Sequence, residues 1–127
     1  MKTKKQIIGQ RGEQEACSLL TGLGHKIICR NWRSAHLEID IISLSGGVLH
    51  IVEVKTRSGA FPADPAEKVD PEKCRRLVRA ANAFLGSRMR ALLPADLEVQ
   101  FDVVAVVFKE PAPEVEYYPE AFLPIYY

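Results

Sequence analysis

The sequence predicts one α/β domain with elements in the order helix, three strands, helix, strand, which gives a mixed central sheet flanked by helices. Three observations support this fold class. Apolar residues recur at helical spacing over 10–23 and again from Cys74 to Leu85. Two alternating segments surround Gly46-Gly47, which indicates a hairpin. The run Leu97–Phe108 is β-branched and almost wholly apolar, as a buried strand should be.

Length and composition limit the class of protein. A chain of 127 residues, 47% apolar and 26% charged, is typical of one globular domain with its own core. No apolar run approaches the roughly 20 residues of a membrane helix, and no signal-type apolar core follows the basic start, so we expect a cytoplasmic protein that binds no membrane. Cys17, Cys29 and Cys74 lack metal-ligand spacing and are predicted to be buried free thiols.

The small net charge of +1 conceals an asymmetry along the chain. Residues 1–90 carry 16 Lys and Arg against 9 Asp and Glu, whereas residues 91–127 carry 1 against 7. A basic body with an acidic end indicates a polyanionic partner such as nucleic acid. An evenly solvated surface explains the same pattern equally well.

The first predicted helix covers 10–23 and ends at Gly22 and Gly24. Its buried stripe comprises Gly12, Ala16, Leu19, Leu20 and Leu23. Glu13 and Glu15 flank opposite sides of this stripe. The spacing alone does not decide which of them faces a site, and two solvated glutamates that complement the helix dipole are the simpler alternative.

A short strand is predicted over 25–32, where it ends in a mixture of cations and an aromatic residue. Arg30, Asn31, Trp32 and Arg33 could hold phosphates and stack on bases. A half-buried Trp with solvated neighbours is the alternative interpretation.

The segment Glu38–Lys55 is predicted to form a hairpin with Gly46-Gly47 as its two-residue turn, because a type I′ turn needs positive φ at both central positions. This register opposes Ser45 to Val48, Leu44 to Leu49, Ile42 to Ile51, Asp40 to Glu53 and Glu38 to Lys55. All four charged side chains would then share one face with the aliphatic ones.

Opposed carboxylates destabilise an antiparallel pair, so stability alone does not explain Asp40 against Glu53. A divalent cation does explain the pair, since it needs carboxylate oxygens converging from a rigid support. Lys55 lies two residues past Glu53 and could stabilise negative charge or position a nucleophile. A solvated hairpin with incidental ion pairs is the alternative, which the large aliphatic neighbours disfavour.

A second helix should begin with Asp70 as its N-cap and Pro71 as its first residue and end near Gly86, after a Gly- and Pro-rich loop over 57–68. Its predicted buried stripe is Cys74, Leu77, Val78, Ala81, Phe84 and Leu85. Lys73 lies at the edge of that stripe and could point toward the site. Solvent exposure and phosphate contact are equally good interpretations of the remaining basic residues, Arg75, Arg76 and Arg79.

The last strand, Leu97–Phe108, should be central, with its unusual Asp102 paired to a cation. His50 faces away from the predicted carboxylate pair, which indicates a structural role. Residues 111–127 are acidic and aromatic and are expected to supply an edge strand near Val115–Tyr118, or a tail.

Asp40 and Glu53-Val54-Lys55 on adjacent strands resemble the PD-(D/E)xK signature of the restriction-endonuclease-like superfamily, whose core has the order α-β-β-β-α-β. A larger set of motifs is similar to the YraN-like family of bacterial proteins, which is regarded as a nuclease family related to archaeal Holliday-junction resolvases. The set comprises Gly9-x-x-Gly12-Glu13-x-x-Ala16, Arg30-Asn31-x-Arg33, Glu38-Ile39-Asp40, Glu53-Val54-Lys55-x-Arg57, Lys73 and Phe101-Asp102-Val103-Val104. That family usually has Gly before its Glu-Ile-Asp, where this chain has Leu37.

The resemblance implies an endonuclease domain over 1–110, with 111–127 as an extension of the same domain. It implies Mg²⁺ or Mn²⁺ held by Asp40, Glu53 and the Val54 carbonyl, and it selects Glu13 over Glu15 as the residue that completes or orients this set. Lys55 would position the attacking water or stabilise the developing charge. Arg30, Arg33, Arg57 and Lys73 would contact phosphates.

The expected activity is metal-dependent cleavage of DNA phosphodiester bonds, with branched DNA as a candidate substrate. Symmetric cleavage of a duplex or junction needs two sites, which favours a homodimer. One rival is a nucleic-acid-binding module of the same fold without catalysis. Another is a scaffold protein whose residues 111–127 recruit a partner.

Overall fold

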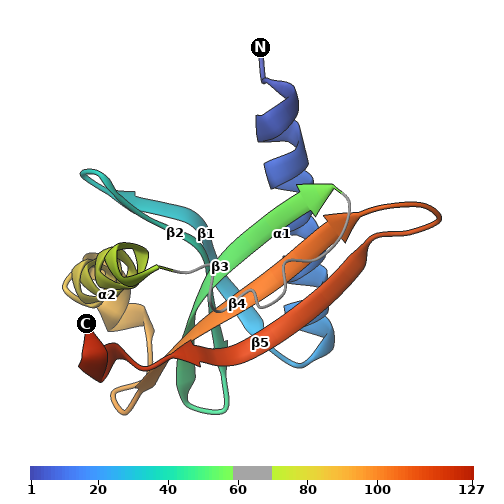
Figure 1. Cartoon of the computed structure of the whole chain (residues 1–127). Coiled ribbons are helices and arrows are strands. Elements are labelled where there is room, and N and C mark those ends of the chain that lie inside the picture. The colour runs from blue at the N-terminus through green and yellow to red at the C-terminus, as the bar shows by residue number, and fades with distance from the viewer. Residues whose placement is uncertain (59–69) are drawn as a thin grey trace.

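The computed structural model describes residues 1–58 and 70–127, and it has a five-stranded sheet with one long helix on each face (Figure 1). The helices are α1 (Lys4–Gly22) and α2 (Pro71–Leu85), and the strands are β1 (Lys26–Ser34), β2 (Leu37–Ser45), β3 (Val48–Ser58), β4 (Glu98–Phe108) and β5 (Glu114–Phe122). Two short 3₁₀ helices, η2 (Arg88–Leu92) and η3 (Pro124–Tyr126), complete the described elements. The predicted α/β class and element order are confirmed.

The strands lie in the order β1-β2-β3-β4-β5, so β3 is central. The β3–β4 pair is parallel and the other three pairs are antiparallel, which makes the sheet mixed as predicted. A parallel neighbour requires a crossover connection, and α2 lies in the connection between β3 and β4. Residues 101–107 of β4 are all buried, as the apolar run predicted. The predicted edge strand is β5, which is longer than Val115–Tyr118.

Each face of the sheet packs its own apolar core. The core under α2 contains Ile42, Ile51 and Phe101 together with Leu77 and Phe84 of the helix. The core under α1 is smaller and is centred on Ala16, Leu20, Ile41, Val52 and Val104. Because alternate residues of β3 face opposite helices, this strand carries polar groups that reach both sides of the molecule.

Helix α1 begins six residues before the predicted boundary of residue 10. Its start is a capping box, in which the Thr3 hydroxyl accepts from the Gln6 backbone N–H and the Gln6 side chain accepts from the Thr3 N–H. The first two turns are almost wholly exposed, and their apolar residues, Ile7 and Ile8, are adjacent in sequence, so these turns carry no apolar periodicity to reveal them. Leu23, predicted to be buried, lies just past the helix end and is 56% exposed.

Helix α2 confirms its predicted start, since the Asp70 carboxylate accepts from the Lys73 backbone N–H at 2.8 Å. Ala80 adds to the predicted buried stripe. The predicted start of the loop over 57–68 is wrong, because Arg57 belongs to β3. Residues 59–68 of the predicted loop lie outside the described residues. Cys17 and Cys74 are buried as predicted, but Cys29 is only half-buried.

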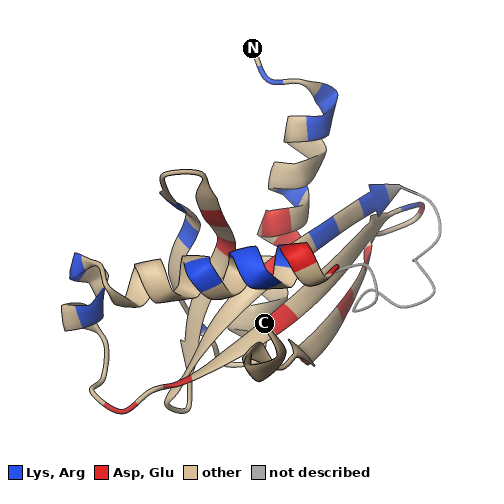
Figure 2. Ribbon diagram, turned by 60° about the vertical axis from the view of Figure 1, so that its left-hand side comes forward, with Lys and Arg blue, Asp and Glu red and all other residues tan. Residues whose placement is uncertain are grey.

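The charges separate in space as well as in sequence. Figure 2 shows Lys and Arg along α2, at the start of α1 and at the far end of β3, whereas Asp and Glu are spread over β4 and β5. A second group of acidic residues lies among the basic elements, near the middle of the molecule. In the described residues, no helix is both long enough and apolar enough to cross a membrane.

Candidate metal and nucleic-acid site

The β2–β3 hairpin has the predicted turn and inner register. Gly46 and Gly47 adopt φ of 57° and 78°, the positive values that a type I′ turn requires. The three predicted inner pairs, Ser45–Val48, Leu44–Leu49 and Ile42–Ile51, are all present. The ladder ends at Ile41–Val52, so the next two predicted pairs, Asp40–Glu53 and Glu38–Lys55, are not part of it.

Beyond Ile41, β2 pairs with β1 alone. Glu38 lies opposite Arg33 and forms an ion pair with it, Oε2 to Nε 3.4 Å, so its predicted pairing with Lys55 is wrong. The regular alternation also fails here, because Ile39 and Ile42 both pack in the core under α2. The prediction that all four charged residues share one face is therefore wrong. Asp40 lies where β2 and β3 part.

Where the two strands diverge, the Asp40 side chain takes the place of a backbone hydrogen-bond partner for β3. Its Oδ2 accepts a hydrogen bond of 2.8 Å from the Val54 backbone N–H. Burial, with a hydrogen bond and negative charge from Glu53, raises the pKa of Asp40 to about 8, and the charge of Glu13 adds to this effect. The two carboxyl groups are thus in contact although their backbones are not paired, and one proton between them relieves the repulsion.

Glu53 is the more buried member of the pair, with a side chain that is 8% exposed. Lys73 of α2 places its Nζ 3.1 Å from Glu53 Oε2. No well-directed hydrogen bond from the described residues reaches that buried oxygen. A buried carboxylate oxygen with an ammonium nearby but no aligned donor is suited to an additional cation.

Glu13 reaches the site because α1 approaches β3 closely at Gly12. A Cβ atom at Gly12 would lie 2.2 Å from Thr56 Oγ1 and 3.1 Å from Thr56 Cβ, so only glycine fits there. Glu13 Oε1 is buried, accepts no hydrogen bond from the described residues, and lies 3.8 Å from Arg30 Nη2. The negative charge of Glu13 acts on Asp40, whose pKa it helps to raise.

A groove of about 460 Å³ opens between the start of α1 and the β1–β2 hairpin. Glu13 and Asp40 line it together with Lys2 and Arg33. A second groove lies on the other side of α1, lined by Lys5, Ile8, Gly9, Val54, Thr56 and Arg57. Cations therefore line the grooves on both sides of the helix, and the first groove also contains the carboxylates.

The predicted cations differ in what they contact. Arg30 is held by Glu13 and by Gln14, whose Oε1 accepts at 3.1 Å. Arg33 and Lys73 are paired with Glu38 and Glu53 as described above. Lys55 is half-buried and Arg57 is exposed, and neither makes an ion pair with another described residue.

The donor set fits a hard divalent cation that keeps most of its own water. Within residues 1–58 and 70–127, no three His, Cys, Asp or Glu side chains are arranged to hold a metal ion by themselves. Mg²⁺ uses one or two carboxylates and retains several waters, so the Asp40–Glu53 pair with Glu13 nearby meets its requirements. Asp40, Glu53 and Glu13 do not supply the four protein ligands that a structural Zn²⁺ site uses.

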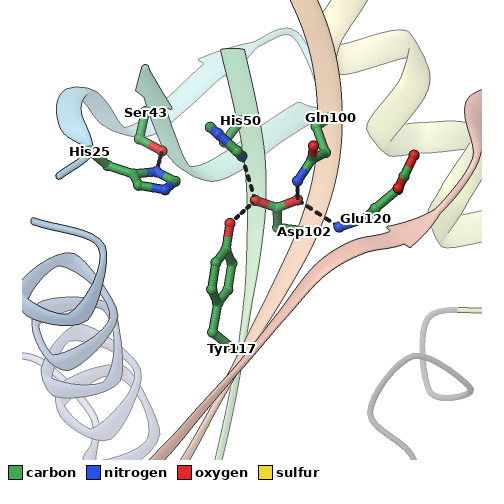
Figure 3. A network of polar contacts seen from close by, with 7 residues as sticks. All are labelled: His25, Ser43, His50, Gln100, Asp102, Tyr117 and Glu120. Atoms are coloured by element: carbon green, nitrogen blue, oxygen red, sulfur yellow. Dashed lines mark hydrogen bonds and ion pairs between the residues drawn. The ribbon is translucent and has the colours of Figure 1, made fainter. Parts of the chain in front are cut away.

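A second polar cluster is centred on the buried Asp102 of β4 (Figure 3). Asp102 accepts hydrogen bonds from His50 Nδ1 at 2.7 Å, Gln100 Nε2 at 2.9 Å, the Glu120 N–H at 3.0 Å and the Tyr117 hydroxyl. Burial alone would raise the pKa of Asp102, but these hydrogen bonds, that of His50 foremost, outweigh it and lower the pKa. The cluster joins β3, β4 and β5, and the basic group that contacts Asp102 is the imidazole of His50.

His25 extends this cluster toward β2. Its ring lies 4.3 Å from that of His50, centroid to centroid, and its Nδ1 hydrogen-bonds Ser43 Oγ at 2.9 Å. Burial lowers the pKa of His25, and the neighbouring His50 lowers it further. No sequence pattern pointed to His25 or Ser43, because they meet only once β2 and the α1–β1 connection fold together.

Comparison with known proteins gives a consistent result. A sequence model for the family described as "Uncharacterised protein family UPF0102" matches residues 12–106. A UPF0102 protein of Bacteroides thetaiotaomicron is 39% identical over 92% of this chain and 93% of its own length. A UPF0102 protein of Nitratidesulfovibrio vulgaris is 39% identical over 93% of this chain and 85% of its own length. One from Oleidesulfovibrio alaskensis is 42% identical over 85% of this chain, which spans about half of that longer protein.

Proposed function

The chain belongs to the UPF0102 family, and from the contact between the half-buried Asp40 and the buried Glu53 we propose that it is a Mg²⁺-dependent endonuclease that cleaves DNA phosphodiester bonds. The observation that carries the proposal is the contact between a half-buried and a buried carboxyl group at the point where two strands diverge. Such a contact costs stability unless a proton or a cation lies between the groups. A structural protein gains nothing from this arrangement.

Each nearby residue has a role that follows from its position. Asp40 and Glu53 would hold the metal, with the Val54 carbonyl as a further candidate ligand, and Glu13 would orient the set from α1. A bound Mg²⁺ supplies Lewis acidity at the phosphate and lowers the pKa of its bound water. Lys55 lies two residues, roughly 7 Å, beyond Glu53 on the same strand, where an ammonium can position that water or stabilise charge on the phosphate.

The surrounding cations suit a polyanionic substrate. The first groove beside α1 places Lys2 and Arg33 with Glu13 and Asp40, and Lys5 and Arg57 line the groove on the other side of the helix. Phosphate contacts of this kind position a nucleic acid without reading its sequence. The acidic residues of β5 (Glu114, Glu116 and Glu120) are exposed, and β5 is the edge strand opposite β1 in the sheet (Figure 2).

The proposal is tested by incubating purified protein with linear and four-way branched DNA, with Mg²⁺, with Mn²⁺ and with EDTA. We expect cleavage of at least one substrate that requires the metal and falls by 100-fold or more in Asp40→Asn, since that variant keeps the shape of the site. Equal cleavage by wild type and Asp40→Asn would reject the catalytic assignment. Binding of DNA that is unaffected by metal, with no cleavage of either substrate, would favour the non-catalytic module.

A further inference from the structure

Lys73 contacts two distinct features of the surface. On one side its ammonium lies 3.1 Å from Glu53 Oε2, within the carboxylate site. On the other side it lines a small pocket of about 80 Å³ between α2 and the tip of the β1–β2 hairpin. Its side chain is 28% exposed, so it can be reached from solvent while it pairs with Glu53.

The pocket has the character of an anion site. Its polar lining consists of His36 at the hairpin tip, Glu38, and Lys73 and Arg76 on successive turns of α2. Glu38 is the single acid there, and its charge is offset by the ion pair with Arg33. Its volume is far below the several hundred Å³ of pockets that hold drug-sized ligands, which suits one phosphate group and excludes a nucleotide.

We propose that the pocket of His36, Lys73 and Arg76 binds one backbone phosphate of the nucleic acid, and that Lys73 couples this phosphate to the carboxylate pair. With no phosphate bound, the Lys73 ammonium neutralises Glu53 and competes with a metal ion for Oε2. A phosphate in the pocket attracts the ammonium away from Glu53, so nucleic acid and metal strengthen each other's binding. This inference rests on the proposed function, because it assigns the substrate path past the same site.

The first arm of the test measures binding of a fluorescein-labelled DNA duplex in EDTA, where no metal and no cleavage take part. Arg76→Gln is compared with Arg79→Gln, a matched variant because Arg79 is also exposed, lies one turn further along α2 and does not line the pocket. We expect Arg76→Gln to weaken binding about fivefold and to reduce the salt dependence by about one phosphate contact. Arg79→Gln should change affinity by less than twofold. Equal losses of duplex affinity in the two variants would reject phosphate binding in the pocket and would indicate that only the general positive charge of the surface contributes.

The second arm measures Mn²⁺ affinity without DNA, from the free-ion signal in electron paramagnetic resonance. Lys73→Met should bind Mn²⁺ about five- to tenfold more tightly than wild type, because Glu53 loses its competing ammonium, while its duplex affinity falls. Arg76→Gln should leave Mn²⁺ affinity within about twofold. Unchanged or weaker Mn²⁺ binding by Lys73→Met would overturn the coupling. A lack of cleavage activity would instead reject the proposed function and leave the first arm unaffected.

Discussion

Replacing Asp40 by Asn should stabilise the protein at neutral and alkaline pH. The pKa of Asp40, raised from 3.8 to about 8, means that the folded state holds a proton that the unfolded chain releases. Between about pH 4 and pH 8 the folded state therefore binds more protons, so the free energy of unfolding of the wild type decreases as the pH rises. Asn mimics the protonated carboxyl, since its carbonyl can accept from Val54 N–H and its amide can donate to Glu53.

The magnitude follows from the size of the pKa change. One pKa unit corresponds to about 1.36 kcal/mol, which sets an upper limit of about 6 kcal/mol for ionising Asp40 in the folded state. Water entering the groove will reduce this value, so we expect Asp40→Asn to be about 2–4 kcal/mol more stable than wild type at pH 9. The two proteins should have similar stability below about pH 4, where Asp40 is protonated in both states.

Urea denaturation followed by circular dichroism, repeated from pH 4 to pH 9 in EDTA, measures this difference. Asp96→Asn is a suitable control, because Asp96 is exposed and should show no such dependence on pH. A constant difference between wild type and Asp40→Asn across this range, or a less stable Asp40→Asn at pH 9, would refute the reasoning that the two carboxyl groups repel each other.

Gly12→Ala should destabilise the protein by about 1–3 kcal/mol in urea, because its methyl group would overlap the Thr56 side chain, whereas Gly9→Ala meets no atom within 4 Å and should stabilise α1 slightly. If adding Thr56→Ala to Gly12→Ala does not recover part of the lost stability, the overlap with Thr56 is not the cause. Asp102→Asn should cost about 2–4 kcal/mol at pH 7. Because the folded-state pKa of Asp102 is lowered, the stability lost in Asp102→Asn should become smaller as the pH falls from about 4 through that pKa. A loss of stability that does not change with pH would contradict an ionised Asp102 in the folded protein. Lys55→Met should reduce cleavage by at least tenfold at saturating Mg²⁺ while Mn²⁺ affinity is retained, and full activity would remove Lys55 from the mechanism.

The fold could be predicted because local signals agreed with each other. Gly46-Gly47 determined the turn, and with it the three inner pairs of the hairpin. The Asp70-Pro71 start determined where α2 begins. Such features depend on residues that are neighbours in the sequence, so a single amino-acid sequence is enough to recognise them.

The geometry around Asp40 differs from the prediction. A regular ladder would have placed Asp40 directly opposite Glu53, and extrapolating it outward missed the divergence after Ile41–Val52. That divergence depends on how β1 and α1 pack against β2, which no local pattern reveals. The ion pair between Lys73 and Glu53 was missed for the same reason, since α2 is brought to the sheet by the core beneath it.

The central claim is that Asp40 and Glu53 together form a divalent-cation site, and an anomalous diffraction measurement on crystals grown with Mn²⁺ near pH 8 tests it most directly. The account predicts a manganese peak about 2–2.5 Å from an oxygen of each carboxylate in the wild type, and a much weaker peak in Asp40→Asn. A fully loaded crystal with no peak between these two residues, or a peak of equal height in Asp40→Asn, would contradict it.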